Sequence, residues 1–505
     1  MRVTFVYPDL IPHVHGWPGY FHAGIGSLSA VLKQGGHQTS LIHVAQPMGQ
    51  VDFIGRLRSW EPGLIAFSST SHMFSLTKKM AGWIKDAGIK TPVICGGIHP
   101  TIAPEDAIGA RGIDMICRGE GEFPLLELCD RMQSGDEIND IRNLWIKTDG
   151  ESVVSNPLRP LNDIDSLPFA DRTIYSYPDL YSEREGRGTF LVSRGCPHNC
   201  TYCCNHLIRK IYGTEGKPIR FRGVDNVLAE IREVIGRYPF IKALAFDDDI
   251  LFMNRRWSEE FTEKYSRQVR LPFMCNARAD VTDEAVVRLL KKAGCYYVKF
   301  GIESGNEEIR YNVLNRHMKN EQISRAFALC KEAGIITHSY NIVGVPDETP
   351  ASILDTIKLN AAIGVDVTHV SIYQPYPGTR LAEICREKGL LESRDLDLDF
   401  CSSSIVRLDT VSAAQVLMFR DYFRAIMKYF QLIHKLPRGL SRVAVKLSDR
   451  VLSLDFTARV LNLLYHPLNF LRRIPARLSA QGRGGLKRAR PVWPMKPPDT
   501  ERIGR

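Results

Sequence analysis

Short apolar runs alternate with helix-like stretches over the first part of the chain. Residues 71–87, for example, repeat apolar positions at helical spacing and separate two of these runs. Strands that alternate with helices are typical of an open, mostly parallel sheet with helices on both faces. We therefore expect an α/β, doubly wound, Rossmann-like domain over residues 1–133. Its predicted strands cover residues 2–7, 38–43, 64–68, 92–95 and 114–117.

A second α/β series follows a weakly patterned stretch. Residues 134–187 contain several prolines and lack regular periodicity, which is typical of a linker. Over residues 188–393, strand-like runs recur with enough chain between them for a helix, and Gly294, Gly334 and Gly364 stand where such helices would end. This pattern predicts a partial (β/α)6 barrel similar to a TIM barrel. The predicted strands are 189–193, 243–247, 271–276, 296–302, 336–343 and 367–373.

The last part of the chain changes character. Residues 394–481 have helical spacing, whereas residues 482–505 predict a disordered basic tail. A length of 505 residues, 24% charged and 44% hydrophobic, fits a folded protein of two or three domains. The chain begins without a secretory signal pattern and lacks a long apolar run, so we expect a cytoplasmic protein. Its 12 cysteines then indicate thiol or metal chemistry rather than disulfides.

The net charge of +10 belongs to one end of the chain. Residues 431–505 hold 16 Lys/Arg and 4 Asp/Glu, a balance of +12, so residues 1–430 carry −2. A nucleic-acid partner would need a basic surface on the folded part of the chain. We therefore expect no nucleic-acid partner. Segments within 411–478 mix apolar and basic residues at helical spacing, as amphipathic helices do. Two interpretations stay open: helices that pack on the barrel and expose a basic face, and peripheral contact with the inner membrane surface.

Three cysteines carry the strongest chemical signal. Cys196, Cys200 and Cys203 form a C-x3-C-x2-C loop directly after the first predicted strand of the barrel series. Three thiolates on one tight loop can bind three irons of a 4Fe-4S cluster and leave the fourth iron open to another ligand. Zinc is the alternative, with His198 or His206 as fourth ligand, but closed zinc sites usually use paired C-x2-C knuckles. We therefore predict a 4Fe-4S cluster on these three cysteines.

The cysteine loop, with the aromatic Tyr202 before its third cysteine, resembles the radical S-adenosylmethionine superfamily over residues 188–393. In that family S-adenosylmethionine chelates the open iron, and an electron from the cluster cleaves it to methionine and a 5′-deoxyadenosyl radical. The resemblance implies a low-potential electron donor of the flavodoxin or ferredoxin type. The cofactors carry the difficult chemistry, while the protein positions them and excludes water.

Charged residues end three of the predicted barrel strands, at the edge where barrel enzymes build their sites. Asp247, Asp248 and Asp249 stand where the family usually has a Gly-Gly-Glu motif that contacts the methionine amino group. Arg278 could pair with the methionine carboxylate by a bidentate contact, and Glu303 stands where similar proteins contact the ribose hydroxyls. Three loop residues resemble the adenine side of the family's site: Gly344, Pro377 and Gly378.

Glycine and hydroxyl residues follow the predicted strands of the first domain. A parallel sheet binds cofactors in the crevice at its carboxyl ends, where glycines let the backbone approach a large ring. The pattern resembles the cobalamin-binding domain that precedes some radical S-adenosylmethionine barrels, and it implies a cobalamin cofactor. The residues that carry this resemblance are Gly24, Gly26, Ser68, Ser69, Thr70, Gly96, Gly97 and 118–122.

Cobalamin proteins of the mutase and methionine synthase type carry Asp-x-His-x-x-Gly, whose histidine binds cobalt from below. Neither His13 nor His15 has that spacing after Asp9, so we expect a cobalt without a histidine beneath it. These two histidines and His22 are interpreted as polar loop residues. Cys204 is interpreted as a packed thiol beside the complete cysteine loop.

The resemblance implies a cobalamin-dependent methyltransferase that acts on an unactivated carbon of a small or lipid-like substrate. In this scheme one S-adenosylmethionine supplies the methyl group through cobalamin and a second supplies the radical. Two alternatives stay open: a non-methylating oxidation or ring closure, like that of the anaerobic magnesium-protoporphyrin ester cyclase, and a cobalamin-binding sensor without catalysis.

Overall fold

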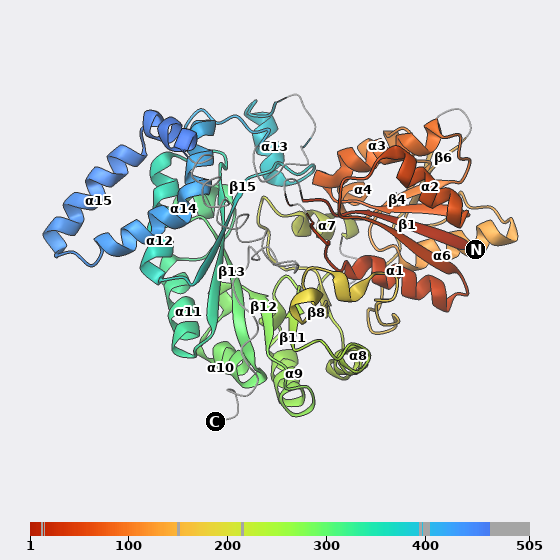
Figure 1. Ribbon diagram of the computed structural model, residues 1–505, viewed down its shortest axis with the longest axis horizontal. Coiled ribbons are helices and arrows are strands. Elements are labelled where there is room, and N and C mark those ends of the chain that lie inside the picture. Colours follow the sequence, from red (N-terminus) through yellow and green to blue (C-terminus); the bar gives the residue numbers. More distant parts are fainter. Residues whose placement is uncertain are drawn as a thin grey trace, which may run out of the picture.

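The computed structural model describes residues 1–11, 14, 16–148, 152–213, 217–392, 396 and 404–464. The predictions for His13, His15 and residues 482–505 lie outside the described residues. Two α/β units lie side by side, and a helical arm extends from the barrel at the end away from the N-terminal unit (Figure 1).

The first unit is built on a sheet with the strand order β2-β1-β3-β4-β5-β6-β7. Strands β1 to β5 run parallel and fall at the five predicted positions, so the doubly wound prediction is confirmed. β6 and β7 join one edge in antiparallel orientation. The strands are β1 (Arg2–Pro8), β2 (Gln38–Val44), β3 (Leu64–Ser68), β4 (Val93–Gly96), β5 (Met115–Cys117), β6 (Leu144–Lys147) and β7 (Val153–Ser155).

Helices cover both faces of this sheet (Figure 1). On one face α1 and α6 bury Leu32 and Leu128, and on the other α2 and α3 bury Phe53 and Met80. Alternate residues of each strand supply the two cores, as the twofold periodicity of a strand requires. The helices are α1 (Ala23–Gln34), α2 (Gln50–Trp60), α3 (Phe74–Asp86), α4 (Ile98–Ile102), α5 (Pro104–Gly109) and α6 (Glu122–Ser134).

The first sheet extends beyond the predicted boundary at residue 133. β6 and β7 lie within the stretch expected to be a linker, and Leu144 and Ile146 are buried in the core. Two strands of three and four residues are too short to produce a clear periodic pattern. Between β7 and the barrel the chain forms only two short turns of 3-10 helix, η2 (Tyr177–Asp179) and η3 (Glu183–Glu185).

The second unit is a sheet of six parallel strands in chain order, β8-β11-β12-β13-β14-β15. All six overlap the predicted positions, although β8 begins and ends earlier than predicted. β8 and β15 form the two edges, so the barrel is partial and does not close. The strands are β8 (Arg187–Phe190), β11 (Ala243–Phe246), β12 (Phe273–Ala277), β13 (Cys295–Glu303), β14 (Ile336–Val343) and β15 (Val367–Ile372).

Helices follow these strands, and three of them end at the positions that Gly294, Gly334 and Gly364 predict. Gly294 and Gly364 adopt left-handed conformations with φ of 93° and 60°, which a glycine accepts without a Cβ clash. A two-stranded ribbon, β9 (Ser193–Arg194) and β10 (Arg220–Phe221), follows β8. The helices are α7 (Cys204–Tyr212), α8 (Val224–Arg237), α9 (Arg255–Gln268), α10 (Glu284–Ala293), α11 (Asn320–Glu332), α12 (Pro350–Ile363), α13 (Arg380–Glu387), α14 (Ala413–Ile433) and α15 (Arg438–Leu452).

Helix α14 packs its buried face, including Phe419 and Phe430, against the barrel core. Within the described chain, none of the helices combines the length and the apolar character needed to cross a bilayer.

Candidate functional site

Two cavities lie at the carboxyl ends of the two sheets. The first, of about 480 Å³, lies between the N-terminal unit and the barrel, and the second, of about 640 Å³, opens over the barrel strands. Asn205, Asp247 and Asp249 line both cavities, so the two spaces adjoin. A molecule bound in one would therefore lie next to a molecule bound in the other.

The N-terminal unit lines the first cavity with the loops singled out in its sequence. Gly26 and Arg118 are the exceptions; at Gly26, α1 approaches the linker, and a Cβ would lie 3.1 Å from that of Ala170. The predicted residues that do line this cavity are Gly24, Ser68, Ser69, Thr70, Gly96, Gly97 and 119–122.

Gly97 has a structural reason to be glycine. Its φ is +98°, and a Cβ there would lie 2.8 Å from the backbone oxygen of Ser69. Gly96 differs, since a Cβ would meet only Cys117 and Phe67, at 3.8 Å or more. A side chain at Gly96 would thus test the cavity without straining the fold.

His22 is part of helix α1 rather than a free imidazole. Its Nδ1 accepts a hydrogen bond of 3.1 Å from the Ile25 amide and caps the helix. Burial lowers the pKa of His22 to about 4, so the ring is neutral and carries its proton on Nε2. Among the described residues lining the first cavity it is the sole histidine, and neither of its nitrogens offers a lone pair to a metal.

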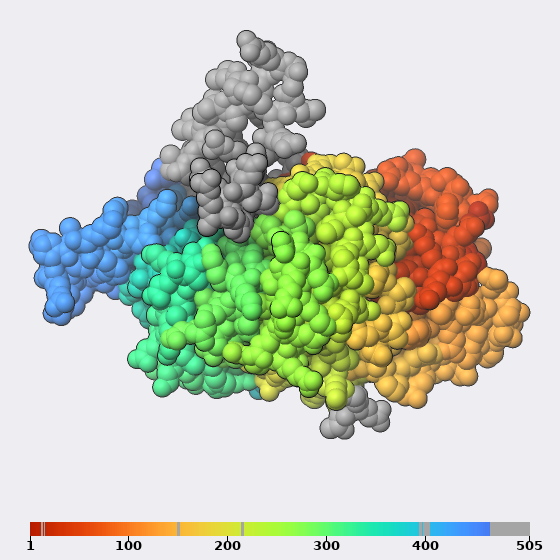
Figure 2. All heavy atoms as spheres, turned by 90° about the horizontal axis from the view of Figure 1, so that it is seen from below, coloured from red at the N-terminus to blue at the C-terminus, as the bar shows by residue number. Residues whose placement is uncertain are grey.

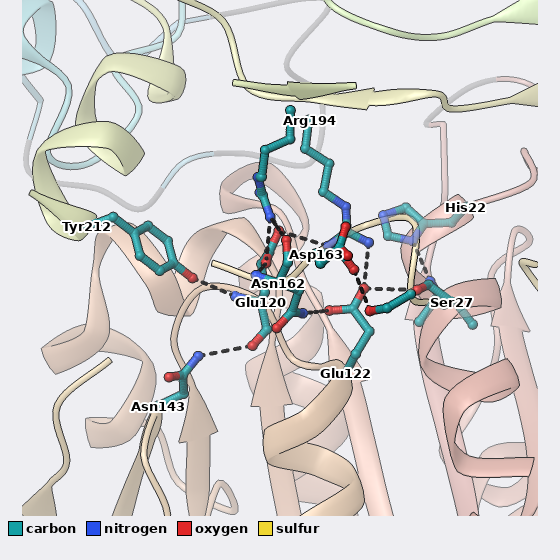
Figure 3. Close-up of polar contacts among 12 residues, drawn as sticks. His22, Ser27, Glu120, Glu122, Asn143, Asn162, Asp163, Arg194 and Tyr212 are labelled. Carbon is teal, nitrogen blue, oxygen red and sulfur yellow. Dashed lines mark hydrogen bonds and ion pairs between the residues drawn. The ribbon is translucent and has the colours of Figure 1, made fainter. Parts of the chain in front are cut away.

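An ionic network joins the two units beside the first cavity (Figure 3). Arg194, two residues before Cys196, donates to Glu120 at 2.8 Å and to Glu122 at 2.6 Å. Arg220 donates to Glu120 at 2.7 Å, and Glu122 also accepts from Ser27. Burial opposes the ionisation of Glu120, but the two arginines outweigh it and lower its pKa below the ordinary value. The network therefore fixes the cysteine loop relative to the N-terminal unit.

Tyr212, at the end of α7, reaches the same loop. The Glu120 amide donates to its hydroxyl at 2.8 Å. A Cβ at residue 119 would lie 1.9 Å from that hydroxyl, so Gly119 is required for the contact. Helix α7, which begins directly after the cysteine loop, is therefore clamped at its far end to the N-terminal unit.

The second cavity contains the three predicted cluster ligands. Cys196, Cys200 and Cys203 all line it. Two buried arginines direct Nη1 at the Cys200 sulfur, Arg278 at 3.8 Å and Arg316 at 3.6 Å. Positive charge beside a thiol is the environment that stabilises a thiolate ligand.

The surroundings do not match a single metal ion. Within the described ranges, no three His, Cys, Asp or Glu side chains converge closely enough to hold one. Cys204 opens helix α7 and lines neither cavity. Cys196, Cys200 and Cys203 line one cavity, where they can bind three irons of a 4Fe-4S cluster.

The three consecutive aspartates have different environments. Alternation along an extended chain turns Asp247 and Asp249 toward the cavities and Asp248 inward. Asp248 is fully buried and accepts from the Val192 amide at 3.0 Å and the Ser193 amide at 2.5 Å. Asp248 therefore holds the segment that leads into the cysteine loop. It does not face the cavity, in contrast to the prediction that it could contact S-adenosylmethionine.

Glu303 lies at the end of β13 in a left-handed conformation with φ of 65°. Such backbone strain in a buried non-glycine residue is found mainly at functional sites. A Cβ at residue 301 would lie 2.2 Å from Glu303 Oε1, so Gly301 makes room for the folded-back carboxylate. Burial raises the pKa of Glu303, and the positive charge of Arg316 opposes that rise.

The three predicted adenine-side residues do not line either cavity. Gly344 donates its amide to Glu348 at 2.7 Å in a tight turn. Gly378 packs against α7 and α4, where a Cβ would lie 2.7 Å from Leu207 and 3.2 Å from the Ile102 oxygen. Tyr376, beside Pro377, lines the second cavity instead.

Several residues that line the second cavity lie outside any sequence motif. Arg316 donates to the Gly301 oxygen at 2.6 Å and so ties the cysteine loop to β13, yet it lies in a loop without a motif. Lys299 lies within a strand, with its ammonium 3.9 Å from Asp247. A charged residue in the middle of an apolar strand is the one sequence feature that could have drawn attention to Lys299.

Two family models match the chain. The radical SAM superfamily matches residues 190–359, and the B12 binding domain matches residues 20–128. These ranges fall within the barrel and within the N-terminal unit, which line the two cavities.

Relatives and solved structures agree with this division. The chain is 27% identical to an uncharacterized methyltransferase of Pyrococcus horikoshii, covering 77% of this chain and 84% of the relative. It is 24% identical to the anaerobic magnesium-protoporphyrin IX monomethyl ester cyclase of Rubrivivax gelatinosus, covering 85% and 78%. The fold is similar to that of the radical S-adenosylmethionine methyltransferase TsrM from Kitasatospora setae, with a TM-score of 0.63, 19% identity and coverage of 78% and 77%. It is also similar to the cobalamin-dependent enzyme OxsB, with a TM-score of 0.65, 15% identity and coverage of 90% and 71%.

Proposed function

We propose that this chain, which matches the radical SAM superfamily over residues 190–359 and the B12 binding domain over residues 20–128, is a cobalamin-dependent radical S-adenosylmethionine enzyme that methylates an unactivated carbon of a small or lipid-like substrate. The family brings three cofactors: a 4Fe-4S cluster, S-adenosylmethionine and cobalamin. The observation that carries the proposal is the shared wall of the two cavities, because a methyl donor and a radical source must both reach one substrate carbon.

The second cavity fits the cluster and S-adenosylmethionine. Cys196, Cys200 and Cys203 would hold the cluster, and two guanidinium groups near Cys200 would balance its negative charge. Glu303 and the cavity-facing aspartates would bind the cationic and hydroxyl groups of S-adenosylmethionine. When bound, the cluster supplies the electron that cleaves S-adenosylmethionine.

The first cavity fits cobalamin. The N-terminal unit contributes a wall of this cavity in which Gly96, Gly97 and Gly119 present only backbone atoms. The lack of side chains there lets a flat ring approach the sheet. His22 is held by its cap, which leaves it without a lone pair for the cobalt, whereas His13 and His15 lie outside the described residues. When bound, cobalamin carries the methyl group.

The protein's own residues position these parts. The Arg194 network holds the cysteine loop against the cobalamin wall, and Asn205 and Asp249 form a hydrogen bond of 3.0 Å where the cavities meet. Lys299, Tyr340 and Gln374 line the barrel side of the second cavity, where a substrate would be anchored. Fixed geometry between the two reacting groups is the main contribution such a scaffold can make.

The cyclase-like relative favours a second candidate, an oxidative ring closure without methylation. Product mass separates the two, because methylation adds CH2 and ring closure does not. The reconstituted, reduced protein should be incubated anaerobically with cell extract and S-adenosylmethionine labelled in its methyl group. A labelled product supports the methyltransferase. Ring closure would instead give 5′-deoxyadenosine without labelled product, and a cobalamin-binding sensor would give neither.

Turnover needs a low-potential electron donor, and we assign this role to a flavodoxin or ferredoxin type protein. The donor would deliver its electron to the cysteine loop, the part of the barrel that carries the predicted cluster ligands. Reduction of the reconstituted cluster by such a donor, followed by loss of its visible absorption, would test this assignment.

A further inference from the structure

The arm formed by α14, α15 and the residues after them exposes an unusual amount of apolar surface. Of 19 exposed large hydrophobic residues in the described chain, 12 lie between residues 429 and 464. Isolated apolar residues on a surface are ordinary, but a concentration of this kind marks an interaction site. We call this set the apolar arm face: Tyr429, Leu432, Leu436, Leu440, Val443, Leu447, Val451, Leu454, Phe456, Val460, Leu463 and Leu464.

On α15 the exposed apolar residues form one stripe. Leu440, Val443, Leu447 and Val451 recur at helical spacing, and Leu447 is 63% exposed. The face that packs on the protein is a different one: Ser448 is buried and bonds Tyr429, and Asp449 pairs with Lys358. The four residues of the stripe are therefore not used to pack α15 against the rest of the protein.

A row of basic residues runs beside the stripe. Arg442, Lys446 and Arg450 are exposed on adjacent turns of α15, and Lys435 and Arg438 precede them. Within the described chain none of these five forms an ion pair, whereas the two carboxylates between 431 and 464, Asp449 and Asp455, are both paired. The arm thus combines an apolar stripe with unneutralised positive charge.

We propose that the apolar arm face binds the surface of an anionic lipid bilayer, with α15 lying parallel to the membrane. A helix with apolar residues on one face and Lys/Arg beside them is the usual form of such an interfacial helix. A second copy of the chain would cover the same residues, but it would bring its own basic row against this one. Anionic headgroups neutralise the row instead.

The position of the arm agrees with this role. It projects from the barrel at the end away from the N-terminal unit, as Figures 1 and 2 both show. A flat surface could therefore contact the arm without displacing the ionic network that joins the two units. The proposal does not depend on the proposed reaction, because it concerns only where the enzyme resides.

Cosedimentation of the full-length protein with vesicles tests the proposal. Vesicles of phosphatidylcholine alone are compared with vesicles containing about 30% phosphatidylglycerol, at about 50 and 500 mM salt. We expect binding to the anionic vesicles at low salt and weaker binding at high salt. The variants Leu447→Glu and Lys446→Glu should each lower vesicle affinity by about tenfold or more. Val51→Glu, at an apolar residue that is 87% exposed in the N-terminal unit, is the matched control and should bind like the wild type.

Three results would overturn the proposal. The first is absence of pelleting with anionic vesicles at low salt. The second is pelleting that Leu447→Glu leaves unchanged, since another part of the chain would then bind the lipid. The third is a dimer in sedimentation velocity that Leu447→Glu dissociates, without any vesicle binding. Circular dichroism of each variant confirms that the helices are retained.

Discussion

Asn205 Nδ2 lies 3.0 Å from Asp249 Oδ2, and both residues line both cavities. Asn205 follows the last predicted cluster ligand by two positions, and Asp249 follows β11. The pair therefore stands between the space assigned to cobalamin and the space assigned to S-adenosylmethionine, and it is positioned by both the cysteine loop and the barrel.

Replacing Asn205 by leucine should uncouple the two cofactors without removing either. The variant loses the hydrogen bond to Asp249, so the partition between the cavities is no longer fixed. We expect unchanged iron content and cobalamin retention, with less methylated product for each 5′-deoxyadenosine formed. A fall in both products by the same factor would show that Asn205 has only a general structural role.

The predicted cluster ligands and the adjacent Cys204 should respond differently to substitution by alanine. Alanine at Cys196, Cys200 or Cys203 should abolish cluster-bound iron and the cleavage of S-adenosylmethionine, while cobalamin uptake stays close to wild type. Cys204→Ala is the matched control, because Cys204 lines neither cavity. Iron analysis and electron paramagnetic resonance measure the outcome. Equal loss of iron in Cys204→Ala would show that the ligands are misassigned.

Glu303→Gln keeps the shape of the side chain and removes its charge. We expect cluster assembly as in the wild type and a loss in S-adenosylmethionine binding of roughly 1 to 3 kcal/mol, about 5- to 150-fold in Kd. Gly301→Ala should weaken binding as well, since its Cβ would displace the Glu303 carboxylate. Equilibrium binding by calorimetry provides the values, and unchanged affinity in both variants would place the cofactor elsewhere.

Asp248→Asn should behave differently from Asp247→Asn and Asp249→Asn. Asp248 accepts two backbone amides on Oδ1 in a fully buried position, and its Oδ2 also accepts from the Val192 amide at 3.3 Å; asparagine keeps the first oxygen but puts a donor in place of the second, so a donor meets a donor there. We expect a loss of about 1 to 3 kcal/mol in stability, seen as a lower Tm, with cofactor affinity affected only through unfolding. The two flanking substitutions should leave Tm close to wild type and reduce cofactor affinity.

For cobalamin, Gly96→Val should reduce retention because the side chain enters the cavity while the fold accommodates its Cβ. Gly97 is a poorer probe, since any side chain there strains the backbone. His22→Ala should leave the visible spectrum of bound cobalamin unchanged and cost about 1 kcal/mol of stability through the lost helix cap. A spectral change in His22→Ala would mean that this histidine contacts the cobalt.

The link between the units should weaken in acid. The arginines hold the pKa of Glu120 below its ordinary value of about 4.3, so its stabilising contribution is complete above that pH and is lost as the pH falls through the lower, folded value. Limited proteolysis of the stretch between β7 and β8 should become faster once the pH falls below the ordinary pKa of Glu120. Arg194→Gln should accelerate it at neutral pH, because Glu122 would be left buried with less compensation.

Local patterns predicted the framework well. All eleven strands expected in the two sheets are present, because each is a short apolar run between turn or helix signals. The cysteine loop, Glu303 and the aspartate run could be found because they stand next to strands. β6 and β7 were missed because they are short and partly exposed.

What the sequence could not show are contacts between residues far apart in the chain. Arg194 meets Glu122 across 72 positions, and Arg316 meets Cys200 across 116. The orientation of Asp248 likewise depends on which side of the extended chain after β11 each side chain takes. A run of three identical residues does not reveal that. Gly344 and Gly378 were expected at the cofactor because of their loops, yet their conformations are explained by the turns and packing around them.

Transfer of a labelled methyl group to a product can be measured by mass. The reconstituted protein, reduced and loaded with cobalamin, is incubated with cell extract and S-adenosylmethionine that carries a deuterated methyl group, and all products are measured by mass spectrometry. We expect 5′-deoxyadenosine together with a product that gains the mass of the labelled methyl group, and neither with Cys200→Ala. Formation of 5′-deoxyadenosine while no product gains the label would contradict it.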